Sequence, residues 1–185
     1  NLIAGQVDSG SMAYVLSTPT KRKTVAFTQI VYMFTALLLM FSLTTITSVI
    51  CLAIVNSSEI TINYSQLLLL NLGAFITMFA ISGICFLASC IFNRSKMSMS
   101  VGGGLSMFFL VATILGLFGS NVIPSAIRID AMKMFNYVSI ITLFDAISIL
   151  NGTLTYLWKF AILIIIGIVA YTIGVFKFDK KDLPL

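Results

Sequence analysis

Four long stretches of this 185-residue sequence contain no charged residue, and they constrain its fold more than any other feature. They cover residues 24–58, 60–93, 97–127 and 160–176. A helix needs about 20 apolar residues to cross the ~30 Å hydrocarbon layer of a membrane. The first three stretches exceed that length, and the fourth reaches it when Leu157 and Trp158 are added. The chain is therefore predicted to be an integral membrane protein.

The composition excludes most other classes of protein. Charged residues make up only 9% of the chain, whereas an ordinary soluble domain carries roughly 25%. A soluble enzyme, a disordered chain and a free nucleic-acid-binding protein are therefore excluded. Histidine is absent, which removes histidine–metal sites and the serine–histidine and cysteine–histidine types of catalysis. The cysteines Cys51, Cys85 and Cys90 lie in apolar stretches and are predicted to be small buried residues.

We predict an all-α fold with four transmembrane helices, because a helix pairs all its backbone polar groups within one segment, as lipid requires. The stretches also lack the strict alternation of apolar and polar residues found in barrel strands. The predicted spans lie near residues 28–53, 67–92, 100–121 and 157–177. Residues 122–156 are predicted to form an outer segment, re-entrant or interfacial, that lies on the membrane or dips partly into it.

Lysine and arginine residues predict the orientation of these spans, since cytoplasmic loops of membrane proteins carry an excess of positive charge. With four spans, one side of the membrane holds eight basic residues and the other holds three. The eight are Lys21, Arg22, Lys23, Arg94, Lys96, Lys177, Lys180 and Lys181. We expect the first five to anchor the chain at the inner membrane surface. Both ends of the chain are therefore predicted to be cytoplasmic.

A fifth span across residues 134–158 is the alternative topology. It would change the charge distribution to six against five, and it would place Asp145 in mid-membrane at a cost of about 3 kcal/mol. Both arguments favour four spans. Asp145 is then predicted to be an exposed acid on the outer segment, with a place on a translocation path as the alternative.

Small residues recur at four-residue steps on two of the predicted spans. Ala112, Gly116 and Ser120 share one face of the third span, and Ala170 and Gly174 share one face of the fourth. Such faces let helix backbones approach closely. We predict that they pack within this chain, with a contact between subunits as the alternative.

Residues 1–23 differ from the predicted spans, because Asp8 and its small polar neighbours interrupt the apolar pattern. Residues 6–16 can still form one short amphipathic helix, which Pro19 separates from the next helix. The apolar residues of this helix are Val7, Met12, Val15 and Leu16. From the residues alone, an interfacial linker with snorkelling cations is the simpler interpretation.

Three motifs occur in the order and at the spacing of one known family. The first is GQVDSGS at residues 5–11, followed by VLSTPTKR at 15–22; the others are FNRSK at 92–96 and FDKKDLPL at 178–185. Together they resemble the permeases of the type 2 exporter family of ABC transporters, over nearly the whole chain. The resemblance implies the carboxy-terminal portion of such a permease, with two further spans upstream of Asn1.

The resemblance also implies a division of the chain and a set of partners. Residues 1–23 would be a cytoplasmic coupling segment and residues 24–185 a transmembrane domain. The coupling segment would dock on a separate ATP-binding cassette subunit through Asp8, Gly10, Ser11, Met12, Val15 and Leu16. A second permease chain, identical or related, would complete the transporter in a bacterial plasma membrane. Bound ATP and Mg²⁺ are expected on the partner subunit, and no cofactor, metal or nucleic acid is expected on this chain.

The predicted function is that of the permease subunit of an ATP-driven exporter that works by alternating access. The chain itself is not expected to be an enzyme. It lacks the phosphate-binding sequence G-x-x-x-x-G-K-[ST], since no lysine follows Gly102–Gly104. An intramembrane hydrolase is excluded because histidine and metal ligands are missing and only Asp145 could lie at membrane depth. The alternative is a non-transporting multi-span protein, such as an immunity, anchor or assembly subunit.

Overall fold

The computed structural model describes residues 3–17, 22–55, 63–119, 124 and 128–181, and within them it is helical without any strand. Its long helices are α3 (Arg22–Val55), α4 (Tyr64–Ile91), α5 (Ser95–Phe118) and α8 (Thr155–Asp179). All four are long and apolar enough to span a membrane. The predicted all-α transmembrane fold with four spanning helices is therefore confirmed.

The helices differ from the predicted spans mainly at their ends. Helix α3 begins at Arg22, six residues before the predicted span, because a helix can continue beyond the apolar layer through charged residues. Helix α5 ends at Phe118, because the N–H of Gly119 bonds back to the carbonyls of Gly116 and Leu117. Hydropathy therefore located the apolar part of each helix, whereas local hydrogen bonds decide where the helix stops.

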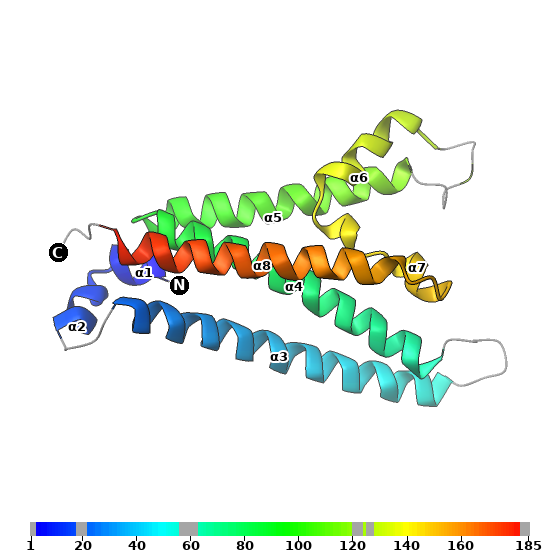
Figure 1. Ribbon diagram of the computed structural model, residues 1–185, viewed down its shortest axis with the longest axis horizontal. Helices are drawn as coiled ribbons and strands as arrows, with labels where there is room; N and C mark the ends of the chain where they lie inside the picture. Colours follow the sequence, from blue (N-terminus) through cyan, green and yellow to red (C-terminus); the bar gives the residue numbers. More distant parts are fainter. Residues whose placement is uncertain (1–2, 18–21, 56–62, 120–123, 125–127, 182–185) are drawn as a thin grey trace.

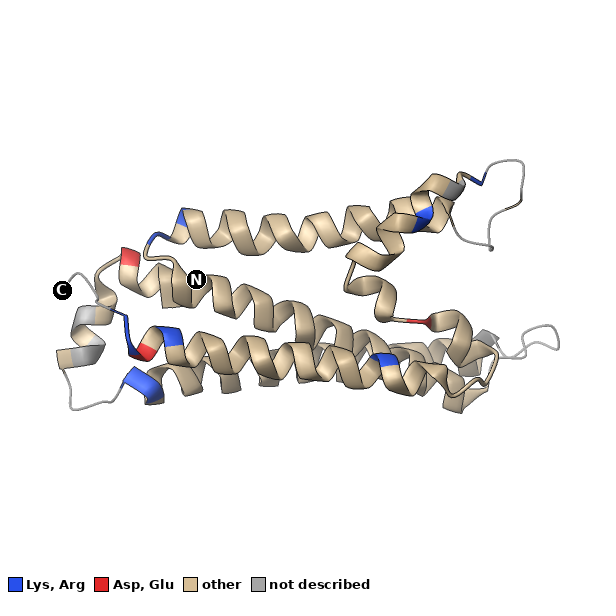
Figure 2. Ribbon diagram, turned by 45° about the horizontal axis from the view of Figure 1, so that its top comes forward, with Lys and Arg blue, Asp and Glu red and all other residues tan. Residues whose placement is uncertain are grey.

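Both ends of the chain lie at the same end of the helix bundle, as an even number of crossings requires (Figure 1). We call this the terminal end, and the end that holds the α3–α4 connection the opposite end. Charged residues gather toward these two ends, and the middle of each long helix carries none (Figure 2). Helix α4 is central, because it packs most extensively on α8 and also contacts α5 and α3.

Glycine residues allow the backbones of α4 and α8 to approach closely. A Cβ atom added at Gly83 would lie 3.0 Å from the carbonyl oxygen of Gly167, and one added at Gly174 would lie 2.9 Å from the ring of Phe86. Ala170 faces the same junction, 3.3 Å from the Cβ position of Gly83. The predicted packing of the Ala170–Gly174 face within this chain is thus confirmed.

The small-residue face of α5 contacts the outer segment at Gly116. Ala112 and Gly116 are buried, and the amide side chain of Asn136 donates a hydrogen bond to the carbonyl of Gly116 over 3.2 Å. Ser120, the third residue of the predicted face, lies outside the described residues. This face therefore also packs within the chain.

The outer segment is a chain of short helices. They are η1 (Asp130–Met134), α6 (Phe135–Val138), η2 (Ile141–Leu143) and α7 (Ala146–Leu150). The two halves, residues 131–138 and 141–150, are bent by 91° relative to one another. The first half packs on α5, and α7 packs on α4 and α8. This geometry is that of a re-entrant loop or a broken span, in place of a straight fifth helix.

Helix α3 packs on the rest of the bundle along one side only. None of its most apolar 18-residue window is buried, although Phe34 makes edge-on contacts with Phe75 and Phe79 of α4 at ring-centroid distances of 6.0 Å. Cys51 is exposed on this helix, whereas Cys90 of α4 is buried. The prediction that all three cysteines are buried therefore holds for Cys90 alone, because Cys85 is only half-buried and Cys51 lies on the side of α3 that faces away from the core.

Candidate functional site

The amino-terminal segment forms two short helices at the terminal end, α1 (Ile3–Asp8) and α2 (Ser11–Ser17). The single helix predicted for residues 6–16 is wrong, since the chain turns at Gly10, whose φ of +72° favours glycine. The hydroxyls of Ser9 and Ser11 both donate to the carbonyl of Gln6, over 3.3 and 3.2 Å. These bonds satisfy a carbonyl that the helix leaves unpaired and so stabilise the break.

Two long-range hydrogen bonds attach α1 to the ends of α4 and α5. The buried N–H of Ala4 donates to Oγ of Ser89 on α4 over 3.0 Å. A carboxylate oxygen of Asp8 accepts a hydrogen bond of 3.1 Å from the N–H of Ser95, the first residue of α5. A carboxylate at this position also interacts favourably with the positive end of the helix dipole. Asp8 therefore holds α1 to α5 within this chain.

Apolar residues of the same segment complete the core at the terminal end. Ile3 is fully buried and Met12 is 2% exposed, in a cluster that includes Phe86 of α4 and Phe178 of α8. Met12 was predicted to face an ATP-binding subunit. Its side chain instead packs against this chain's own helices, because burial there removes a large apolar group from water.

The side of α1 and α2 that faces away from the bundle is a polar surface with one aromatic residue. We call it the coupling surface, and its described exposed members are Asp8, Ser9, Gly10, Ser11, Tyr14 and Ser17. Asp8, Gly10 and Ser11 were among the predicted contact residues. The side chains of Val15 and Leu16 lie outside the described part of the structure.

Tyr14 was missed by the sequence prediction, although it is the first aromatic residue of the chain. It is 83% exposed on α2, and no other large side chain of the coupling surface is so accessible. Aromatic residues of this kind often supply much of the binding energy at protein interfaces. An aromatic residue in a short polar segment was the signal that could have identified it.

The basic residues near both termini join the ends of three helices. Arg22 donates to the carbonyl of Lys181 over 2.8 Å, and Lys23 forms an ion pair of 3.4 Å with Asp179. The ammonium of Lys181 donates to the carbonyl of Cys90, at the end of α4, over 2.9 Å. Burial lowers the pKa of Lys181 from its ordinary value.

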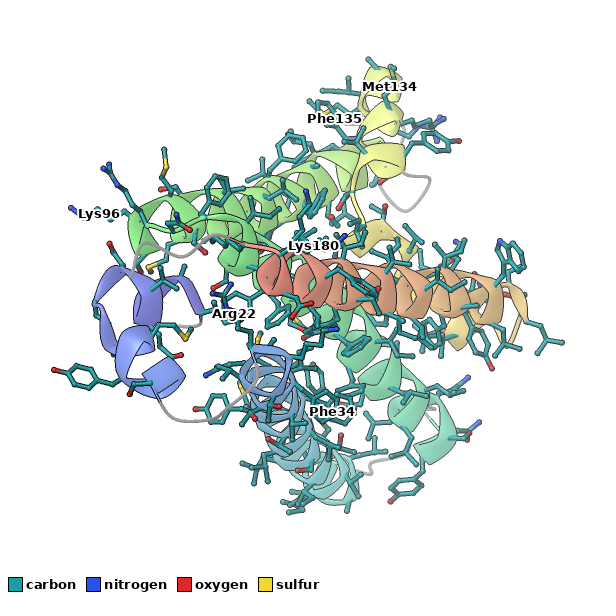
Figure 3. The ribbon with its side chains drawn as sticks, turned by 60° about the vertical axis from the view of Figure 1, so that its left-hand side comes forward. Arg22, Phe34, Lys96, Met134, Phe135 and Lys180 are labelled. Atoms are coloured by element: carbon teal, nitrogen blue, oxygen red, sulfur yellow. The ribbon has the colours of Figure 1, made fainter. Side chains whose placement is uncertain are left out.

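The predicted inner-surface anchors therefore fall into two groups. Arg22 and Lys23 bind residues near the carboxy-terminal end of α8, whereas Arg94, on the turn before α5, and Lys96, in the first turn of α5, are exposed. Figure 3 shows Arg22 and Lys96 on separate helices at this end of the molecule. Lys21 lies outside the described residues.

At the opposite end, Asp145 is the centre of a charged cluster. One of its oxygens accepts from the N–H of Ser148 over 3.1 Å, and the other accepts from the hydroxyl of Ser148 over 2.7 Å and from Lys159 over 2.5 Å. Burial raises the pKa of Asp145, but these hydrogen bonds outweigh it and hold the pKa below its ordinary value. The side chain is 21% exposed, so the predicted exposed acid is instead a half-buried, paired one.

A cavity of 620 Å³ lies beside this ion pair, between α5, the outer segment and α8. Its polar lining includes Thr113, Asn136, Thr142, Asp145 and Lys159. Ser139, which is 1% exposed, ties the outer segment to α5 by donating to the carbonyl of Phe109 over 2.8 Å. The outer segment is thus attached to α5 by polar contacts and to α8 by a charge pair.

Replacing Lys159 by methionine is expected to destabilise the protein by about 1–2 kcal/mol at neutral pH, because Asp145 loses a charged hydrogen-bond donor. The folded pKa of Asp145 lies below 3.8, its ordinary value. The ion pair therefore stabilises the fold above about pH 4, and this contribution is lost as the pH falls through the folded pKa.

Thermal unfolding of the purified protein in detergent, at neutral pH and at about pH 3, measures this effect. The difference between wild type and Lys159→Met should shrink as the pH falls toward and through the folded pKa of Asp145, because a protonated carboxyl group no longer pairs with Lys159. Lys96→Met is the matched control, since Lys96 is exposed at the terminal end. If the difference in unfolding temperature between wild type and Lys159→Met does not change with pH, the stabilising role of the ion pair is contradicted.

No group of three or more histidine, cysteine, aspartate or glutamate residues in the described ranges is placed to hold a metal ion. The polar features of the molecule are instead the coupling surface at the terminal end and the Asp145–Lys159 cavity at the opposite end. Helix α5 contacts both regions, through Ser95 at its start and Thr113 near its end. Helix α5 therefore connects the polar surface at the terminal end with the cavity at the opposite end.

Comparison with known proteins gives one family. The sequence model of the family described as "ABC-2 family transporter protein" matches residues 1–183. No curated protein and no solved structure gives a significant match.

Proposed function

Because the chain belongs to the ABC-2 family of transporter proteins, we propose that it is the permease subunit of an ATP-driven exporter whose terminal end faces the cytoplasm. The family is that of the membrane component of ABC transporters, which is not itself catalytic. The observation that carries the proposal is the coupling surface, an exposed polar face on two short helices that are fixed to the bundle. ATP binding and hydrolysis would take place on a separate subunit docked there.

The attachments of α1 and α2 support this role. Ala4 is bonded to α4, Asp8 is bonded to α5, and Met12 packs in the core. A movement of the docked ATP-binding subunit would therefore be transmitted to the ends of these spanning helices, because α1 and α2 are attached to them. Helix α5 would carry that movement toward Ser139 and the outer segment.

The positive charge at the terminal end supports the proposed orientation. The described basic residues there are Arg22, Lys23, Arg94, Lys96, Lys177, Lys180 and Lys181, against three at the opposite end, Arg128, Lys133 and Lys159. An excess of lysine and arginine marks the cytoplasmic side of a membrane protein.

The exposed faces of α3 and α5 support the proposal of a second permease chain beside this one. Both helices present large apolar side chains outward, including Leu39 and Leu43 on α3 and Phe108 and Val111 on α5. Lipid would cover part of this surface, and the second chain, identical or related, would cover the rest. Substrate would move between the two chains by alternating access.

The test is co-purification of the complete permease with its ATP-binding subunit after the change Tyr14→Ala. We expect the dissociation constant for the ATP-binding subunit to rise about tenfold, which corresponds to ~1.4 kcal/mol of binding energy. The matched control is Tyr137→Ala, because Tyr137 is also highly exposed (91%) but lies on α6 at the opposite end.

Loss of association with Tyr14→Ala alone would support docking at the coupling surface. Equal association in both variants and the wild type would contradict it. A permease that binds no ATP-binding subunit at all would favour the alternative of a non-transporting anchor or assembly protein. Labelling of the terminal end from outside intact cells would overturn the proposed orientation.

A further inference from the structure

We propose that a groove between α4 and α8 at the terminal end binds an anionic phospholipid. The groove has a volume of 610 Å³. It is lined by Cys90, Ile91, Ile173, Phe176, Lys177, Lys180 and Lys181. The inference depends on the placement of the spanning helices in a membrane, and it does not depend on the docking of an ATP-binding subunit.

The charges of the groove favour an anion. Lys177 and Lys180 are both exposed, and no described residue forms an ion pair with either. Asp179 lies between them in sequence, but its carboxylate is paired with Lys23 of α3. Three ammonium groups therefore line the groove with no carboxylate among its lining residues.

Lys181 has a different role from the other two lysines. Its ammonium donates a hydrogen bond to the carbonyl of Cys90, in the last turn of α4. This bond fixes one wall of the groove and leaves Lys177 and Lys180 as the groups available to a ligand. A phosphate group accepts hydrogen bonds from several lysines at once, so two adjacent ammonium groups suit it.

The apolar wall of the groove favours a lipid over a soluble anion. Ile91, Ile173 and Phe176 are 47%, 43% and 64% exposed, respectively. Ile173, Phe176 and Lys180 follow one another at three- and four-residue steps, so they lie on one side of α8. Apolar side chains therefore precede the lysines along the helix, as an acyl chain precedes its headgroup at a membrane surface. Basic pockets of this kind between spanning helices bind anionic headgroups in other membrane proteins.

The experiment is native mass spectrometry of the complete permease in detergent, with phosphatidylglycerol or phosphatidylcholine added. We expect the wild type to retain phosphatidylglycerol at least tenfold more strongly than phosphatidylcholine. The double variant Lys177→Gln/Lys180→Gln should lose most of this preference. The charge-matched control is Arg94→Gln/Lys96→Gln, which removes two positive charges from the same end, outside the groove; Figure 3 shows Lys96 on α5 and Lys180 at the end of α8.

Three results would overturn the proposal. The groove variant could keep the preference for phosphatidylglycerol, or the control variant could lose it equally, which would indicate a general charge effect. Soluble glycerol phosphate could displace the lipid at equal concentration, which would show that the apolar wall contributes nothing. Unfolding temperatures of all variants without lipid verify that each is folded, and Lys177→Arg/Lys180→Arg should restore binding.

Discussion

Replacing Gly83 by valine is expected to disrupt the packing of α4 on α8, the most extensive helix contact of the molecule. A Cβ at Gly83 would lie 3.0 Å from the backbone oxygen of Gly167 and 3.3 Å from both Ala170 and Tyr171. Backbone atoms cannot move aside as a flexible side chain does, so the two helices must separate. We expect a loss of about 3 kcal/mol or more in the free energy of unfolding.

The matched control is Gly103→Val on α5, which introduces the same side chain into a spanning helix. A Cβ at Gly103 would meet no atom within 4 Å, so no steric cost is expected. Unfolding of both variants in detergent micelles measures the difference. Equal stability of the two would show that α4 and α8 are not in the close contact described above.

Replacing Asp8 by lysine is expected to give the largest loss of transport. The variant removes the acceptor of the Ser95 N–H and places a cation at the positive end of α5. Repulsion there would displace α1 from α5, and the coupling surface with it. We expect substrate-stimulated ATP hydrolysis by the assembled transporter to fall about tenfold, the effect of ~1.4 kcal/mol.

Asp8→Asn separates the two roles that Asp8 can have. Its side-chain oxygen still accepts from the N–H of Ser95, so a role limited to this hydrogen bond predicts near-normal activity. If the charge itself contacts the ATP-binding subunit, Asp8→Asn should lose substrate-stimulated ATP hydrolysis to the same extent as Asp8→Lys. Full activity of Asp8→Lys in a correctly folded transporter would contradict both roles.

The amino-terminal segment illustrates how far the sequence could predict the site. The motif around Asp8 indicated a distinct segment ahead of the first span, and the structure places two helices there. The direction in which Met12 points could not be predicted, because a helix of seven residues offers too few turns to define a buried face. Phe86 and Phe178, which help to decide that direction, lie far away in the sequence.

The charged residues show the same limit at both ends of the molecule. Lys23 and Arg22 were predicted as anchors to the membrane surface, since each sits beside an apolar stretch. Their partners are at the carboxy-terminal end of the chain, at Asp179 and Lys181. Likewise, Asp145 was predicted to be exposed, because nothing in its local sequence indicates that Lys159 of α8 lies beside it.

The class of the protein, the number of long helices and their approximate positions could all be predicted from the order of the residues. These properties follow from long uncharged stretches, because lipid accepts only apolar segments whose backbone is paired internally. The packing of the folded chain sets which residues of those helices meet, where the short amino-terminal helices attach and which charges form pairs. Such contacts join residues as far apart as Asp8 and Ser95, separated by 87 positions. No local pattern encodes them, since they depend on how the helices pack on one another.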